Sequence, residues 1–310
     1  MQKSILINYL HIILKLMFNW NDLNSFLTLS RSSRLLKASK KLKIEPTTIA
    51  RRIKRLEKSL NCNLFHKSPK GYFLTEKGSE LVKYAENIES EIFRINENLE
   101  IKSSLIRGKV RISVGEGLGV EIISKHIHKF YEKNPEIEIE LLADTKSRSI
   151  SNRETDILIS LSRPHSGRLK YWKLCDYFVK LYASKNFLKE NQISSFQDLN
   201  NNPFISYVDE FIDFPELDYL KEVCVNANVL FTSNSLRSQL IAVKSGLGLG
   251  LLHTFIGRKH DDILPVLGDK INIKREYWVI SHENNYQLER FRAVFVFLKE
   301  LSKNNFINDS

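Results

Sequence analysis

The first sixty residues carry apolar side chains at helical spacing in three successive segments. Residues 21–30 and 34–42 each place their apolar positions on one face, which predicts two amphipathic helices. Pro46 follows a break in the pattern and suits the first turn of a third helix, where its missing N–H group is not needed. The buried stripe predicted for this third helix consists of Ile49, Ile53, Leu56 and Leu60.

Two short strand-like segments come next. "NLFHK" and "GYFLT" are joined by "SPKG", which predicts a β-hairpin within residues 63–75. Three helices followed by a basic hairpin predict a winged helix-turn-helix, whose third helix is sized for the major groove of DNA. We assign residues 17–75 to this domain and expect Met17 to be the initiating methionine.

A long helix is predicted over residues 76–102. Its apolar residues recur at alternating intervals of three and four, at Leu81, Ala85, Ile88, Ile92, Ile95 and Leu99. This heptad seam favours a dimerisation helix, and the alternative is a long helix that packs on its own domain. We assign residues 76–107 to a linker helix.

From Gly108 onward, strand and helix patterns alternate. The predicted strands include "KVRISV", "EIEIELLA", "TDILISL", "FVKLYAS", "PFISY", "NVLFT" and "REYWVIS". A helix over 119–134 should bury Val120, Ile123, Ile127 and Phe130. Alternation of this kind predicts an α/β fold with largely parallel sheets, and residues 108–303 are numerous enough for two lobes.

Charge is concentrated in one part of the chain of 310 residues, which has a formal net charge of +11. Thirteen Lys and Arg residues lie between Arg31 and Lys70, against only Glu45 and Glu57, so this stretch accounts for the whole excess. Local positive charge of this size beside neutral domains indicates a polyanionic partner, nucleic acid before membrane. The alternative is a basic face that is merely solvated.

The cysteines and the apolar N-terminal stretch bear on the compartment. Cys62, Cys175 and Cys224 are few, far apart and odd in number, which argues against a secreted disulfide framework. The stretch "ILINYLHIILKLMFNW" is interrupted by polar residues, too short to span a bilayer, and lacks a cleavage pattern. We therefore expect a cytoplasmic protein with no membrane partner.

Several motifs with possible chemistry are better explained by structure. "GLGLG" follows a predicted helix, so we interpret Gly246 as a helix C-cap and not as part of a dinucleotide site. His126 and His128 point to different helix faces and are expected to be solvated, and no further ligand completes a metal set. Cys175 and Cys224 are expected to be packed thiols, with a redox pair as the alternative. No catalytic motif is present, so we predict no enzyme, no cofactor and no metal.

A ligand site can be placed from topology. Ligands of open α/β sheets bind beyond the carboxyl ends of strands, near helix N-termini. The residues at these positions are Gly115, Glu116, Gly117, Ser160, Ser162, Thr232, Ser233 and Asn234. For each Ser or Thr alone, helix capping is the alternative role.

The chain resembles the LysR-type transcriptional regulators from Met17 to Lys303. The segment "LKIEPTTIARRIKRLEKSLNCNLFHKSPKGYFLTEKG" is similar to the family's N-terminal signature, and "RGKVRISVGEGLG", "ETDILISLSRP" and "AVKSGLGLGLL" are similar to landmarks of its effector domain. The resemblance implies a homodimer or homotetramer held by the linker helix. It also implies an effector domain of the type II periplasmic-binding-protein fold, in which the topological candidates converge on one cleft.

Several positions depart from the family pattern. Glu45, Pro46 and Thr47 stand where Ser-Gln-Pro is usual, and Ala50 replaces a later Ser, so the family's operator sequence does not transfer. In the effector domain, Ser160 stands where close relatives often have Arg, and His253 where Pro is usual. Both alter the pocket, and His253 joins the candidate effector residues.

The sequence therefore predicts a DNA-binding transcriptional regulator whose activity is modulated by a small molecule, polar or anionic in character. The residues expected to contact double-stranded DNA are Thr47, Thr48, Arg51, Arg52, Arg55, His66, Lys67 and Lys70. The alternative is a small-solute sensor whose N-terminal module mainly oligomerises. Steep salt dependence of duplex binding separates the two functions.

Overall fold

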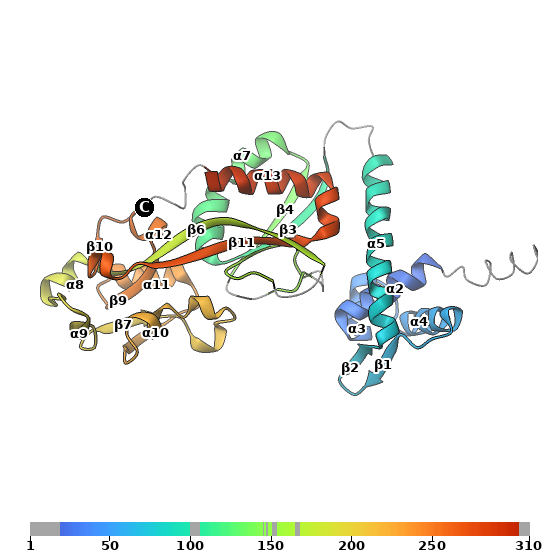
Figure 1. The fold of residues 1–310 in the computed structure, drawn as a ribbon, viewed down its shortest axis with the longest axis horizontal. Coiled ribbons are helices and arrows are strands. Elements are labelled where there is room, and N and C mark those ends of the chain that lie inside the picture. Colours follow the sequence, from blue (N-terminus) through green and yellow to red (C-terminus); the bar gives the residue numbers. More distant parts are fainter. Residues whose placement is uncertain are drawn as a thin grey trace, which may run out of the picture. The chain divides into compact units, whose positions relative to one another are not determined.

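The computed structural model forms two compact units, which are described one at a time. The units are Met1–Lys102 and Ser103–Ser310 (Figure 1). The residues that the structure describes are 19–99, 106–144, 146, 148–150, 154–164 and 168–303. Met17 and the predicted end of the linker helix at Lys102 lie outside these ranges.

Three helices form the core of the first unit. They are α2 (Trp20–Ser32), α3 (Leu35–Leu42) and α4 (Pro46–Leu60). Ile49 and Leu56 of α4 are fully buried, and Ile53 is 4% exposed. They pack against Leu23 and Phe26 of α2 in one apolar cluster. The predicted stripe of the third helix is thus confirmed as the side that builds the core.

The predicted hairpin is present and is fixed to the helices. Strands β1 (Phe65–Ser68) and β2 (Gly71–Leu74) pair antiparallel. Gly71 has a φ of +137°, and a Cβ there would lie 2.3 Å from the Ser33 carbonyl oxygen, so a side chain does not fit. The next residue, Tyr72, donates its backbone N–H to the same oxygen at 2.8 Å. The hairpin therefore rests on the turn between α2 and α3, which completes a winged helix-turn-helix.

Helix α5 (Glu76–Leu99) has two kinds of apolar residue on it. Leu81 and Ala85 pack into the core of the first unit. Ile88 and Ile95, from the same predicted seam, are 38% and 51% exposed. The N-terminal half of the helix therefore packs on its own domain, as the alternative interpretation expected, whereas Ile88 and Ile95 of the same seam are open to solvent. The side chain of Leu99 lies outside the described part.

Among the residues that the structure describes, a single mixed sheet of nine strands organises the second unit. Its strand order is β4-β3-β5-β11-β6-β9-β7-β8, with β10 paired to β6. The bounds are β3 (Gly108–Val114), β4 (Ile137–Ala143), β5 (Ile157–Ser160), β6 (Leu169–Ser184), β7 (Pro203–Ser206), β8 (Asn228–Thr232), β9 (Leu249–His253), β10 (Ile263–Pro265) and β11 (Ile273–His282). The strand segments predicted from alternation are all found, although β6 is much longer than expected.

The expectation of largely parallel sheets holds only within each lobe. Strand β3 pairs parallel with β4 and β5 in lobe one, and β7 pairs parallel with β8 and β9 in lobe two. Strands β6 and β11 are antiparallel to each other and to their neighbours, and they run through both lobes (Figure 1). The prediction failed here because alternation of short segments cannot reveal one strand shared by two lobes.

A β-bulge lies in the middle of the long strand pair. Tyr277 faces Cys175, but the next residue, Trp278, faces Lys173, so Leu174 is the extra residue. Leu174 and Cys175 are accordingly both buried, and beyond the bulge the odd-numbered Tyr177, Val179 and Leu181 are buried. Beyond the bulge, Tyr177 is fully buried and lines a cavity between the lobes.

The helices of the second unit cover the two lobes separately. They are α6 (Glu116–Leu118), a π-helical segment (Gly119–Ser124), α7 (Lys125–Lys133), α8 (Lys185–Glu190), α9 (Phe196–Leu199), α10 (Tyr219–Val223), α11 (Leu236–Lys244), α12 (Thr254–Gly257) and α13 (Glu289–Lys303). Short 3-10 turns lie at Asp209–Phe211, Pro215–Leu217, Gly268–Lys270 and Glu283–Gln287. Helices α7 and α13 lie over lobe one, and α8 to α12 surround lobe two (Figure 1).

The π-helical segment corrects the predicted face of the helix over 119–134. A π turn adds a residue and rotates the preceding turn of the helix relative to the next one. Val120 is therefore 37% exposed, whereas Ile122 is buried in its place. His126 was expected to be solvated and is instead buried, with Nδ1 2.8 Å from the Ile122 carbonyl oxygen. His128 is exposed, as expected.

Candidate functional site

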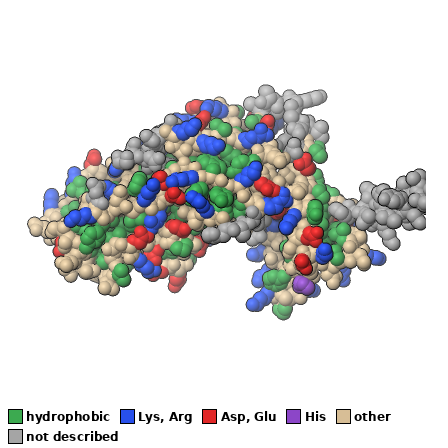
Figure 2. Space-filling model, viewed as in Figure 1, with side chains coloured by type: hydrophobic (Ala, Val, Ile, Leu, Met, Phe, Trp, Pro, Cys, Tyr) green, Lys and Arg blue, Asp and Glu red, His purple; other side chains and the backbone are tan. Residues whose placement is uncertain are grey.

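The outward face of α4 carries hydroxyls and positive charge. Thr47 and Arg51 are exposed in its N-terminal half, and Thr48 is half-buried. Arg51 makes no hydrogen bond or ion pair with any residue that the structure describes. Lys and Arg side chains also stand along the edge of the unit that carries the hairpin (Figure 2). This end of the helix is the part that can enter a major groove first.

Two of the predicted DNA-contacting arginines have partners inside the unit. Arg55 donates from Nε and Nη2 to the two carboxylate oxygens of Asp22, both at 2.5 Å. Asp22 is only 2% exposed, and this contact raises the pKa of the Arg55 guanidinium. Arg52 donates to the Ser25 hydroxyl at 3.3 Å. These side chains join α4 to α2, which leaves Arg51 as the freer guanidinium.

The hairpin is held to α4 by the one acidic residue in the helix's basic stretch. The Glu57 carboxylate accepts hydrogen bonds from the backbone N–H groups of Leu64 at 2.8 Å and Phe65 at 3.3 Å. Helix and hairpin are thus joined at the start of β1, although Glu57 looked in sequence only like a charge opposing its neighbours. The carboxylate accepts from buried backbone groups there, which is why a basic helix keeps one glutamate.

The hairpin itself presents the remaining predicted DNA contacts. His66, Lys67 and Lys70 are all exposed. Lys67 lies over the ring of Tyr72, with Nζ 6.0 Å from its centroid. The backbone N–H of Lys70 donates to the Ser68 hydroxyl at 3.1 Å, which orders the turn and leaves the ammonium group outside it. The structure therefore offers a helix face and a basic turn on one rigid domain.

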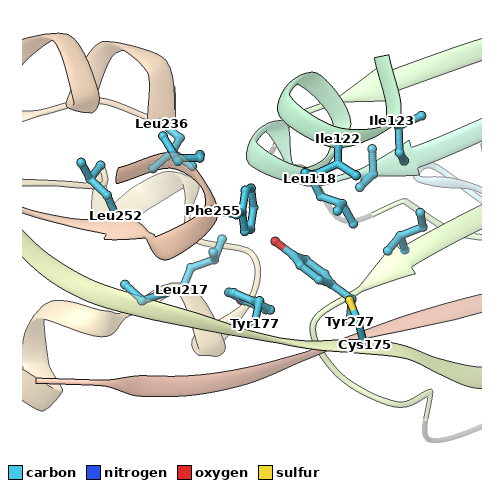
Figure 3. Close-up of a cluster of buried hydrophobic side chains, with 14 of the residues drawn as sticks. Leu118, Ile122, Ile123, Cys175, Tyr177, Leu217, Leu236, Leu252, Phe255 and Tyr277 are labelled. Carbon is cyan, nitrogen blue, oxygen red and sulfur yellow. The ribbon is translucent and has the colours of Figure 1, made fainter. Parts of the chain in front are cut away.

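In the second unit, a cavity lies between the lobes. Its volume is about 440 Å³, including the space at its open mouth. Four predicted effector residues line it: Gly115, Glu116, Gly117 and His253. Figure 3 shows a cluster of buried hydrophobic side chains that includes three lining residues of the cavity, Tyr177, Leu217 and Tyr277, with the Tyr277 hydroxyl directed toward Phe255.

Glu116 connects the lobes at the edge of this cavity. Its carboxylate accepts from the Ser235 hydroxyl at 2.9 Å and from the backbone N–H of Leu236 at 2.5 Å. Ser235 is the N-cap of α11, so the carboxylate of one lobe occupies the N-terminus of a helix in the other. Free N–H groups at helix N-termini favour negative charge, which explains the contact.

His253 stands at the carboxyl end of β9, against aromatic rings. It is 4% exposed, and neither ring nitrogen has a hydrogen-bond partner among the described residues. Burial lowers the pKa of His253 to about 3, so the imidazole is neutral. The ring of Tyr177 lies 4.9 Å from it and stacks on Tyr277 at 4.2 Å. The Tyr177 hydroxyl in turn forms a hydrogen bond of 3.0 Å with that of Tyr219.

The other five predicted effector residues do not line the cavity. The Ser160 hydroxyl accepts from the Ser162 backbone N–H at 3.2 Å and shapes a turn. Thr232 and Asn234 are exposed, and Ser233 accepts from the Ser235 N–H at 3.2 Å. The helix after β8 is capped by Ser235, slightly later in the chain than expected, which displaces all three residues from the cavity.

The remaining lining residues of the cavity were not predicted. They are Asp144, Ile159, Leu161, Tyr177, Tyr207 and Tyr277 together with Phe214 and Leu217 from the loops of lobe two. Tyr177 and Tyr277 come from β6 and β11, whose passage through both lobes was missed. The sequence does contain a signal for these two long strands: apolar residues alternate on both sides of "CDYF" (175–178) and "EYWV" (276–279).

The thiols and the glycine-rich segment match their structural interpretation. Cys175 and Cys224 are buried and free, and burial raises the pKa of Cys175 to about 12. A thiol with a raised pKa is poorly nucleophilic, which opposes the redox alternative. Gly246 follows α11 with a φ of +83°, as expected of a C-cap. Among the described residues there is no cluster of three or more potential metal ligands, and none of the described helices is long and apolar enough to cross a membrane.

Two family models match this arrangement of a winged helix-turn-helix followed by a two-lobed α/β domain. "Bacterial regulatory helix-turn-helix protein, lysR family" covers residues 20–79, and "LysR substrate binding domain" covers residues 103–303. The chain belongs to the LysR family. As a LysR-type transcriptional regulator, it binds DNA through the first unit and a small-molecule effector through the second. The regulators of this family are not generally enzymes.

Relatives and solved structures support the same family. The chain is 21% identical to the uncharacterized HTH-type transcriptional regulator YkuM of Bacillus subtilis, over 90% of this chain and 96% of the relative. It is 24% identical to the glycine cleavage system transcriptional activator homolog of Haemophilus influenzae, over 88% and 91% of the two chains.

Two full-length structures share the fold of this LysR-family chain. OxyR of Pseudomonas aeruginosa has a TM-score of 0.65 at 16% identity, covering 92% of this chain and 98% of its own. LysG of Corynebacterium glutamicum, solved with bound effector Arg, has a TM-score of 0.64 at 16% identity and the same coverage.

Proposed function

We propose that this regulator reads its operator chiefly through Thr47, Thr48 and Arg51, and grips the backbone through Arg52, His66, Lys67 and Lys70. The observation that supports this division is the difference between the arginines of α4. Arg51 is exposed and has no partner among the described residues, whereas Arg55 is paired with the buried Asp22. Arg55 therefore belongs to the scaffold of the domain more than to the DNA interface.

Effector binding is assigned to the inter-lobe cavity, with Gly115, Glu116, Gly117 and His253 among its contacts. Its concave, partly apolar shape with a few polar groups is typical of small-molecule sites. The structure of LysG with bound effector Arg supports a sensing role for a domain of this fold. An effector can shift the regulator between states only if it binds those states with different affinities.

A homodimer or homotetramer is proposed to form through α5. Tyr84, Ile88 and Ile95 expose 60%, 38% and 51% of their surface along one side of this helix. We assign residues 76–107 to this linker, 17–75 to DNA binding and 108–303 to sensing. We further propose that the protein is cytoplasmic, where its DNA target lies, and that it catalyses no reaction.

Selection of bound fragments from genomic DNA, followed by titration, tests the assignment of DNA contacts. Arg51→Ala should lose about 1 to 3 kcal/mol of binding free energy on the selected site and much less on a scrambled duplex. Lys70→Ala, the control in the hairpin turn, should weaken both duplexes alike and lower the salt slope by about one unit. Equal losses on both duplexes for Arg51→Ala would show that α4 contacts only the backbone.

A further inference from the structure

The charge of the inter-lobe cavity is negative. Among the described residues that line it there are two carboxylates, Glu116 and Asp144, and no Lys or Arg. Asp144 is neutralised by Arg148, whose Nη1 and Nη2 donate to its two oxygens at 2.6 Å. Glu116 has a hydroxyl and a backbone N–H as partners and forms no ion pair with a described Lys or Arg. The net negative charge at the cavity therefore resides on Glu116.

The same glutamate blocks the natural place for an anion. A carboxylate or phosphate would be attracted to the N-terminus of α11, where N–H groups point outward. That position is filled by the Glu116 carboxylate, bound to Leu236 and Ser235. An anionic ligand would have to displace Glu116 and then lie beside it. The expectation of an anionic effector thus finds no supporting group along the described lining.

The walls suit a positive charge. The rings of Tyr177, Tyr207, Tyr277 and Phe214 line the cavity. Aromatic faces attract ammonium and guanidinium groups, and the attraction is stronger when water is excluded. Tyr177 and Tyr277, stacked with an interplanar angle of 19°, form a fixed part of this wall.

His253 adds a hydrogen-bond acceptor. It is neutral in its buried position, so one ring nitrogen carries no proton and can accept from an N–H donor. A Cβ on Gly117 would lie only 2.8 Å from the Nδ1 atom of His253. The imidazole therefore fits at this position because residue 117 has no side chain. Both ring nitrogens are buried without a hydrogen-bond partner among the described residues, which destabilises the fold. A ligand that forms hydrogen bonds with them would remove this cost.

We propose that the cavity binds a small organic cation, an amine or a guanidine with a short apolar body. Its N–H groups donate to the Glu116 carboxylate and to His253, and the tyrosine rings cover its charge. The proposal rests on the assignment of effector binding to this cavity. Glu116 and His253 both line the cavity, so the bound cation joins Glu116 of one lobe to His253 of the other.

Matched probes of one shape and different charge test the class of ligand. Calorimetry on the full chain would compare butylamine and butylguanidine with neutral 1-butanol and anionic butyrate. The cations should bind, and the other two should bind at least tenfold more weakly. Glu116→Gln keeps the shape and one acceptor oxygen for the Leu236 N–H but removes the charge, and it should lower cation affinity tenfold or more. The control is Glu121→Gln, because Glu121 pairs with Lys259 outside this cavity and its loss should not alter binding.

A second variant, at His253, keeps the proposal testable if Glu116→Gln fails to fold. His253→Phe keeps a ring in the cavity and removes the acceptor, and it should weaken both cations severalfold. Preferential binding of butyrate or 1-butanol, no binding of either cation, or unchanged cation affinity in Glu116→Gln would overturn the proposal. Operator titrations with the same probes separate the two assignments. If butyrate binds and alters operator affinity, effector sensing stands and only the cationic class fails.

Discussion

The guanidinium of the exposed Arg55 and the carboxylate of the buried Asp22 form a two-point ion pair between α4 and α2. The side chain of Arg55 is 58% exposed and that of Asp22 only 2%. Removing the arginine leaves a charge buried without its partner, whereas removing an exposed, unpaired arginine leaves nothing behind. The two neighbours Arg51 and Arg55 should therefore give opposite results in stability and DNA binding.

We expect Arg55→Ala to loosen the first unit. Amide hydrogen exchange in α2 and α4 of the full chain should become about tenfold faster or more, because local opening reports the stability of each region. Arg51→Ala, the matched control, should leave exchange close to wild type. In Asp22→Asn/Arg55→Ala, where the buried charge is gone, most of the protection should return. Equal exchange in both single variants would show that the ion pair contributes nothing.

Glu57 should stabilise the position of the hairpin. In Glu57→Ala the backbone N–H of the fully buried Leu64 loses its acceptor, at a cost of about 1 to 3 kcal/mol in the free energy of unfolding. Urea denaturation measures this loss. Glu45→Ala is the control, since Glu45 precedes the same helix and makes no side-chain cap there. A loss of similar size in both variants would assign the effect to helix charge and not to the hairpin.

The open part of the α5 seam should be an interface between copies of the chain. Ile88→Asp places a carboxylate on this surface, which is unfavourable if the surface becomes buried, and should shift the protein toward monomer. Light scattering over a range of concentrations measures the change. Asn87→Asp adds the same group one residue earlier and should leave the oligomer intact. An unchanged mass for Ile88→Asp would place the interface elsewhere.

Burial of His253 predicts a loss of stability in mild acid. The folded pKa of about 3 lies below the usual value of 6.5, so the unfolded chain takes up a proton at this residue first as the pH falls. Stability must therefore decrease between these two values. His253→Phe should remove about 2 kcal/mol of the loss between pH 7.5 and pH 5.0, measured as the free energy of unfolding at each pH. A parallel decline in both proteins would show that other groups dominate.

The winged helix-turn-helix could be predicted in detail because its signals are local. Pro46, the apolar stripe of α4 and the "SPKG" turn each act within a few residues, and each is found where it was expected. The roles of Arg55 and Glu57 could not be predicted, since their partners depend on tertiary packing. Charge alone cannot distinguish an arginine that meets DNA from one that meets a buried aspartate.

The lining of the inter-lobe cavity could be predicted only at the ends of strands. Gly115, Glu116 and Gly117 follow β3 and line the cavity, which is the position that topology predicts for them. The aromatic wall could not be anticipated, because Tyr177 and Tyr277 face the cavity through the pairing of two strands a hundred residues apart. His126 was missed for another reason: the π-helical segment changes the helical phase, and no pattern of period 3.6 contains that information.

The bulge at Leu174 makes the cavity dependent on the length of the chain as well as on its side chains. Alternate residues of a strand face opposite sides, so removal of one residue exchanges the two sides from that point onward. Deletion of Leu174 would restore a regular ladder with Tyr277 and Trp278, and would thereby turn either the inner positions of lobe one or those of lobe two toward the wrong layer. Replacement of Leu174 by another apolar residue changes only local packing. The presence of one extra residue, Leu174, therefore allows both lobes to share β6 and β11 with their apolar side chains facing the correct layer in each.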